Sequence, residues 1–153
     1  MKKKILVEIV AFLFMLLFFY AAFNKLAEYQ KFRIQVGQSP LLTGFGSVIP
    51  PGVIAVEIVT GVMLMVPALR LAALYISFSL MVMFSVYIIA ILNFSPYVPC
   101  SCGGVLEKLS WSEHLVFNVV FVLLAVLGIW LDTLERISIV PQEKTLEAAK
   151  NSN

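Results

Sequence analysis

The sequence is poor in charged residues and in the side chains that build metal centres. Charged residues make up 13% of its 153 residues, whereas a typical soluble domain carries about 25%. The 11 Lys and Arg residues nearly balance 9 Asp and Glu residues, so the strong positive field that nucleic-acid binding needs is missing. One His and two Cys leave little material for a metal site. We therefore expect no nucleic-acid partner and no bound metal.

Hydrophobic residues are instead abundant and make up 61% of the chain. A soluble protein of this size could not bury so much apolar surface, because its surface-to-volume ratio is too high. The composition argues against a soluble enzyme. It predicts a small integral membrane protein in contact with the lipid bilayer along most of its length.

Four apolar runs stand out, and a helix needs about 20 residues to cross the hydrocarbon. Backbone polar groups in lipid must be satisfied within the segment, so the runs are predicted to be helices. The fold class is therefore all-α, a polytopic bundle of four transmembrane helices. The predicted spans are Ile5 to Phe23, kept as an uncleaved first helix, Gly52 to Leu69, Leu71 to Phe94, and Leu115 to Leu131.

The charges of the connecting segments predict the orientation, because cytoplasmic loops are enriched in Lys and Arg. With both termini inside, seven basic residues are cytoplasmic and four are outside. The inner set is Lys2, Lys3, Lys4, Arg70, Arg136, Lys144 and Lys150, and the outer set is Lys25, Lys31, Arg33 and Lys108. We expect one domain over residues 1–135 and a short, frayed cytoplasmic tail over residues 136–153.

Two outer segments follow from this topology. The first begins at Asn24, where the first helix is expected to continue past the membrane and to end near Gly37. The second connects the third and fourth spans and holds the sequence Cys100-Ser101-Cys102-Gly103-Gly104. Ser110 and Glu113 form a capping box that predicts the start of the last helix.

The spacing of Cys100 and Cys102 is the most specific chemical feature. A relaxed disulfide has its Cα atoms about 4.4–6.8 Å apart, and an extended pair two positions apart is at or beyond that limit. A bond between them would be strained, and strained bonds tend to be labile or catalytic. Thiol–disulfide exchange is the leading interpretation. A structural loop disulfide, two free thiols, and a metal site completed by His114 are the alternatives.

Three further polar residues are candidates for auxiliary roles. Glu57 lies within the second span, where a charge is costly unless it is paired or protonated. Lys25, at the end of the first helix, has the length to reach it. The two would form a structural clasp, or part of a quinone or proton pocket. His114 would lower the pKa of a nearby thiol, or simply lie at the interface.

The chain resembles the MauE/DoxX-like group of four-helix membrane proteins over residues 1–135, in particular the branch named after the methylamine-utilisation protein MauE. The matching segments are Asn24-Lys25-Leu26, Phe32, Ser39-Pro40-Leu41-Leu42, Pro51 to Gly61 with Glu57, and Cys100 to Gly104. The resemblance implies a redox-associated protein of the bacterial inner membrane. It also implies a periplasmic thioredoxin-like partner, and its DoxX-like relatives imply a link to quinone.

One departure from related disulfide-forming membrane proteins affects the mechanism. Those proteins relay electrons between two cysteine pairs, whereas this chain has two cysteines in all. We hypothesise thiol–disulfide exchange through Cys100 and Cys102 on the periplasmic side, with His114, Lys25 and Glu57 as auxiliary residues. The alternative hypothesis is a non-catalytic membrane subunit or anchor of a larger complex, in which the disulfide only pins the loop.

Overall fold

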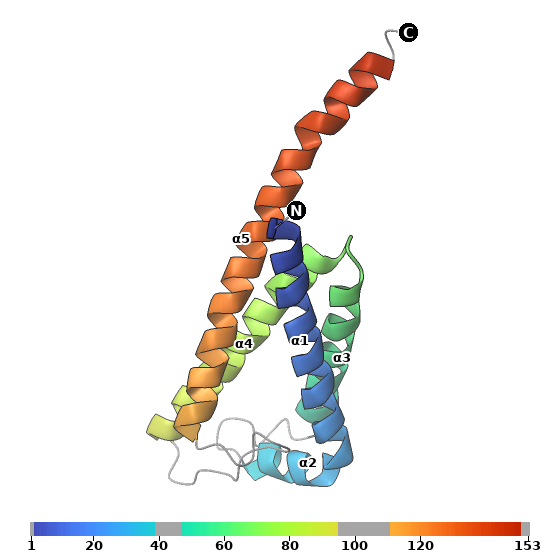
Figure 1. Ribbon diagram of the computed structural model, residues 1–153. Helices are drawn as coiled ribbons and strands as arrows, with labels where there is room; N and C mark the ends of the chain where they lie inside the picture. The colour runs from blue at the N-terminus through green and yellow to red at the C-terminus, as the bar shows by residue number, and fades with distance from the viewer. Residues whose placement is uncertain (1, 39–46, 95–110, 151–153) are drawn as a thin grey trace.

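The computed structural model describes residues 2–38, 47–94 and 111–150 (Figure 1). The elements over these residues are helices, with no strand among them, which confirms the predicted all-α class. They are α1 (Lys2–Ala27), α2 (Tyr29–Gln38), α3 (Ile49–Met65), α4 (Arg70–Phe94) and α5 (Trp111–Lys150).

Three helices, α1, α4 and α5, are long and apolar enough to cross a membrane, and α3 is a shorter apolar helix of 17 residues. Its 17 residues are at the lower limit for a spanning helix. These helices run alternately up and down, so the chain is a multi-pass membrane protein built as a helical bundle (Figure 1). α1 packs on α3 and α5, while α4 packs on α5 and α3.

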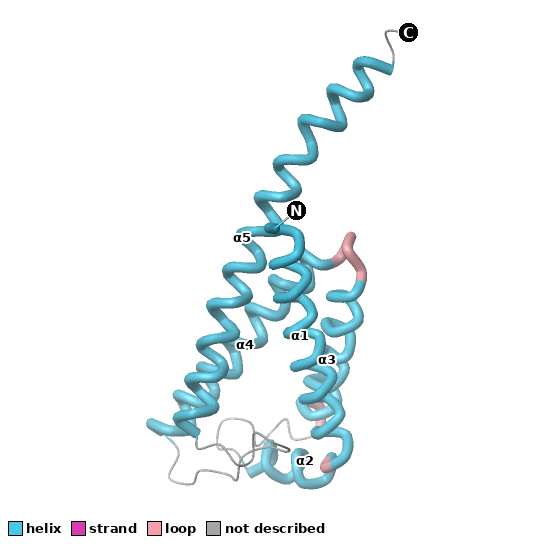
Figure 2. The backbone as a smooth tube through the Cα atoms, viewed as in Figure 1, coloured by secondary structure: helices cyan, strands magenta, loops and turns pink. Residues whose placement is uncertain are grey.

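The bundle has two distinct ends. At one end lie the first residue of α1 and the turn between α3 and α4, and the last part of α5 leaves the bundle there (Figure 1). We call this the terminal end. At the opposite end α2 crosses the bundle, and α4 ends and α5 begins there; we call this the α2 end (Figure 2). Toward the α2 end, the α1–α3 pair and the α4–α5 pair diverge in this view.

The structure corrects the predicted extension of the first helix. Instead of one helix that ends near Gly37, the chain bends at Glu28 and forms the separate helix α2. Backbone hydrogen bonds bridge the bend, from the Glu28 amide to the Asn24 carbonyl and from the Phe32 amide to the Glu28 carbonyl, both at 3.0 Å. The bend allows Phe32 to pack beside Ile54 in a small core.

Two other helix ends also differ from prediction. α3 stops at Met65 rather than Leu69, because Val66 is extended and the residue before a proline, here Pro67, disfavours the helical conformation. α5 does not end near Leu131 with a frayed tail but continues as helix to Lys150. Its extension projects beyond the other helices (Figure 1).

The main core joins α1, α3, α4 and α5. Phe14 stacks on Phe18 and meets the edge of Phe121 at a centroid distance of 5.2 Å, and Leu74 is fully buried beside them. Close packing at the terminal end depends on Gly128, where an added Cβ would lie 3.0 Å from Val10 Cγ1. The core therefore fixes the terminal end tightly.

Candidate functional site

An ion pair between α1 and α3 is the centre of the candidate site. Lys25 lies in the last turn of α1, and its Nζ donates to Glu57 Oε1 at 2.7 Å. The Glu57 side chain is 1% exposed and that of Lys25 is 15% exposed. The structure thus brings together these two sequence-predicted residues, with both charges withdrawn from water.

Two aromatic rings flank the Lys25 ammonium. Its Nζ lies 5.8 Å from the centroid of Phe32 in α2 and 5.9 Å from that of Phe84 in α4. Both distances allow a cation–π interaction, whose range is about 6 Å. Side chains of three other helices, α2, α3 and α4, therefore surround the ammonium of Lys25, although neither ring was among the predicted auxiliary residues.

The first turns of α5, the fifth helix, carry two further polar side chains, those of His114 and Asn118. His114, in the first turns of α5, is half-buried and close enough to Lys25 to be influenced by its charge. Asn118 is one turn further along α5, on the same face because residues four apart are neighbours on a helix, and is 3% exposed. We call Lys25, Glu57, His114 and Asn118 the α2-end cluster.

Several polar atoms of this region lack hydrogen-bond partners within the described part of the chain. They are Glu57 Oε2, His114 Nδ1, Asn118 Nδ2 and, beside Lys25 in the sequence, Asn24 Nδ2. Buried polar groups are normally satisfied, and each exception calls for an explanation. The buried serines of the core do not share this property, since Ser77 and Ser85 donate to the carbonyl of the preceding turn.

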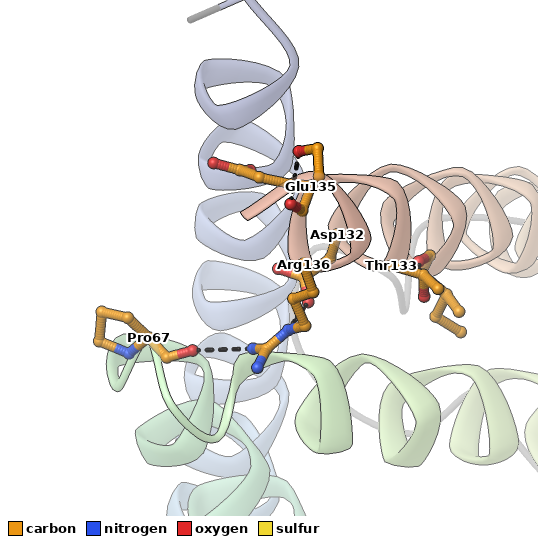
Figure 3. A network of polar contacts seen from close by, with 7 residues as sticks. Pro67, Asp132, Thr133, Glu135 and Arg136 are labelled. Carbon is orange, nitrogen blue, oxygen red and sulfur yellow. Dashed lines mark hydrogen bonds and ion pairs between the residues drawn. The ribbon is translucent and has the colours of Figure 1, made fainter. Parts of the chain in front are cut away.

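A second polar network lies at the terminal end (Figure 3). Arg136 Nε donates to Asp132 Oδ2 at 2.6 Å, and Arg136 Nη2 donates to the Pro67 carbonyl at 3.2 Å. These contacts tie α5 to the turn between α3 and α4. The Arg136 side chain is 43% exposed, so this network joins two elements at the protein surface and not in the core.

The sequence-predicted pair Cys100 and Cys102 lies outside the described residues. The two helices that this connection joins are described, and both Phe94 and Trp111 lie at the α2 end of the bundle (Figure 1). The connection therefore starts and finishes at the same end as the α2-end cluster. Within residues 2–38, 47–94 and 111–150, no group of three or more His, Cys, Asp and Glu side chains is arranged to hold a metal ion.

Comparison with known proteins gives one match. A family described as methylamine utilisation protein MauE matches residues 3–131. The matched range contains all four residues of the α2-end cluster, and it ends before the projecting part of α5. No curated protein and no solved structure matches the chain.

Proposed function

The chain belongs to the MauE family, and from that premise we propose that this membrane protein takes part in thiol–disulfide exchange through Cys100 and Cys102. One observation carries the proposal. The chain has two cysteines in all, they are two positions apart, and the connection that holds them joins two helix ends at the α2 end. A pair placed in this way serves exchange with a protein in the adjoining aqueous compartment.

The exchange itself is balanced without any other reactant. A thiolate of a partner dithiol attacks one sulfur of the Cys100–Cys102 disulfide, and a mixed disulfide forms as the other sulfur leaves as a thiolate. The second partner thiol then resolves the mixed disulfide, so the partner gains a disulfide and this chain holds two thiols. The strain expected for a disulfide between residues two apart favours this direction of opening.

The charge distribution supports a location for the cysteine connection, and the family resemblance supports a partner protein. Basic residues favour the terminal end as cytoplasmic, which puts the cysteine connection on the periplasmic side of a bacterial inner membrane. Disulfides persist in that oxidising compartment. We propose a periplasmic thioredoxin-like protein as the partner.

A quinone is the cofactor class that fits this arrangement. With one cysteine pair, the chain needs a second redox partner to complete a cycle. When bound, a quinone supplies a two-electron, two-proton redox couple within the membrane. Lys25, Asn118 and His114 would hold it through their N–H groups, beside the rings of Phe32 and Phe84.

Redox trapping in intact cells tests the exchange function. A membrane-impermeant maleimide is applied to wild type, Cys100→Ser and Cys102→Ser cells, with and without mild reductant. We expect wild type to be labelled only after mild reduction, and each single variant, which keeps one unpaired thiol, to be labelled without it. The single variants should also accumulate reducible mixed disulfides with another protein.

The same experiment distinguishes a membrane anchor. Labelling of wild type only after denaturation and strong reduction would identify a structural disulfide and overturn the exchange function. The double variant Cys100→Ser/Cys102→Ser gives the second readout. Lower thermal stability with an unchanged oxidised fraction of envelope thiols would favour the anchor.

A further inference from the structure

Two arginines meet the turn between α3 and α4 at the terminal end of the bundle. Arg136 reaches this turn from α5, where its Nη2 donates to the Pro67 carbonyl at 3.2 Å (Figure 3). Arg70, three positions after Pro67, is the first residue of α4. The Cα–Cβ bonds of a helix tilt toward its N-terminus, so the side chain of Arg70 is directed toward the same turn.

The packing of α4 on α5 puts the two arginines on facing sides of these helices. A Cβ at Gly128 would lie 3.3 Å from Leu74 Cδ2, so Gly128 and Leu74 face each other. Residues four apart are neighbours on a helix, and Arg70 is therefore one turn from Leu74 on this face. Arg136 lies two turns from Gly128 on the facing side of α5. The two helices run in opposite directions, so both steps lead toward the terminal end (Figure 1).

The Arg70 guanidinium has donor capacity that the described part of the chain does not use. Its Nε atom is buried and has no hydrogen-bond partner within residues 2–38, 47–94 and 111–150, although a guanidinium carries five N–H groups. Asp132 on α5 is 6% exposed and accepts instead from Arg136 Nε at 2.6 Å. An acceptor from outside the chain would satisfy the Arg70 donor, whose burial is otherwise unfavourable.

The terminal end also carries an excess of positive charge. Residues 2–8, 67–70 and 132–136 contain five basic and three acidic residues, whereas residues 24–57 and 111–118, toward the α2 end, contain three of each. Positive charge together with a free N–H donor indicates an anionic ligand with oxygen acceptors. Guanidinium groups suit phosphate in particular, because two parallel N–H groups match two of its oxygens.

The apolar surroundings indicate that the phosphate belongs to a membrane lipid. The end of α3 and the turn expose Met65, Val66 and Leu69, by 62%, 40% and 45%. A helix of 17 residues rises about 26 Å, which is less than the roughly 30 Å of hydrocarbon. The turn after α3 is thus close to the boundary between acyl chains and headgroups, where apolar side chains contact the chains and arginines reach the phosphate.

We propose that Arg70 and Arg136 bind the phosphate of an anionic phospholipid, such as phosphatidylglycerol, at the turn between α3 and α4. Basic sites between membrane helices are suited to such headgroups. Asp132 and the Pro67 carbonyl hold Arg136 in position, and Arg70 adds the guanidinium whose Nε is free. This inference goes beyond the proposed function and does not depend on it, because neither the cysteines nor the α2 end takes part.

Native mass spectrometry of the full-length protein in a neutral detergent counts bound lipids directly. The protein, freed of co-purified lipid, is titrated with dioleoylphosphatidylglycerol or with dioleoylphosphatidylcholine, which has the same chains and no net charge. Glycerophosphoglycerol, the soluble headgroup, is the third ligand. We expect one tightly bound phosphatidylglycerol, with an apparent Kd about tenfold below that of phosphatidylcholine, and no binding of the soluble headgroup at the same concentrations.

Variants of the two arginines test the position of the site. Arg70→Gln, and separately Asp132→Asn/Arg136→Gln, which removes both charges of the ion pair, should each abolish the preference for phosphatidylglycerol. Since both lipids are measured on each variant, retained binding of phosphatidylcholine separates loss of the site from loss of folding. The matched control is Arg33→Gln, which removes an exposed arginine of α2 at the opposite end and should keep the preference.

Several results would overturn the inference. Equal affinity of the unaltered protein for the two lipids would mean that no anionic headgroup is recognised. An unchanged preference in Arg70→Gln would put the anionic lipid elsewhere, and an equal loss in Arg33→Gln would ascribe the preference to total charge. Binding of glycerophosphoglycerol as tight as that of the lipid would make the ligand a soluble phosphate ester.

Discussion

The side chain of Lys25 pairs with a buried carboxylate instead of extending into water. A lysine at the end of a membrane helix can extend along apolar surface toward the interface, yet Lys25 turns into the bundle and is only 15% exposed beside Glu57. Removal of the ammonium would leave a carboxylate that is 1% exposed without its counter-charge. Such a loss is more damaging than removal of both partners, because the remaining charge stays desolvated.

This difference gives a prediction for the ion pair. Lys25→Met should destabilise the protein by about 3 kcal/mol, while Lys25→Met/Glu57→Met should recover most of that loss. Thermal unfolding in one detergent, followed by circular dichroism, measures both variants against wild type. A double variant less stable than Lys25→Met would contradict this prediction. The loss of stability in Lys25→Met could then not be due to the unpaired carboxylate of Glu57.

The pairing of these residues could be predicted from sequence, but the full cluster could not. Glu57 interrupts an apolar run, where a charge is costly unless it is paired or protonated, and Lys25 has the length to reach it. The position of Asn118 relative to Lys25 depends on the rotation of α5 about its axis. In lipid a helix is apolar on its outer face as well as on its inner face, so hydrophobic periodicity does not reveal that rotation.

At the scale of elements, the same reasoning explains which helices were predicted well. Runs of apolar residues predict α1, α4 and α5. Pro50 and Pro51 lie in the first turn of α3, where the missing N–H group of a proline costs no helical hydrogen bond. The bend before α2 was missed because it depends on tertiary packing of Phe32 beside Ile54. The helical continuation of α5 was missed because a polar sequence with helix-forming residues is compatible with either a helix or a frayed end.

Contact between helices leads to a prediction at two glycines. A Cβ at Gly128 would lie 3.0 Å from Val10 Cγ1 and 3.3 Å from Leu74 Cδ2, whereas a Cβ at Gly52 would meet nothing within 4 Å. Gly128→Ala should therefore destabilise by about 1–3 kcal/mol through overpacking. Gly52→Ala, the matched control, should stabilise by up to about 1 kcal/mol through helix propensity.

Thermal unfolding of the two alanine variants is the measurement for this prediction. The opposite signs matter more than the sizes, because both substitutions add the same methyl group to a helix. If Gly128→Ala were as stable as Gly52→Ala, then α1, α4 and α5 would not be closely packed at the terminal end.

At the scale of the whole molecule, the number of helices that cross the membrane determines on which side of it each connecting segment lies. The helices of the bundle alternate in direction, so Lys2 and the start of the projecting part of α5 belong to one side (Figure 1). The charge imbalance of seven basic residues to four, counted from the sequence, predicts that this side is cytoplasmic. On this prediction, the proposed exchange function would belong to the outer half of the protein.

Two serines at opposite ends of the bundle test this arrangement. Ser47 precedes α3 at the α2 end and Ser138 lies in α5 beyond the turn at Pro67, and both are exposed. In a Cys100→Ser/Cys102→Ser background, we expect Ser47→Cys to react with an impermeant maleimide in intact cells. Ser138→Cys should react only after the membrane is permeabilised. The reverse pattern would invert the orientation and put the cysteine connection in the reducing cytosol, where a persistent disulfide is not expected. Reaction of both in intact cells would contradict a bundle that spans the membrane.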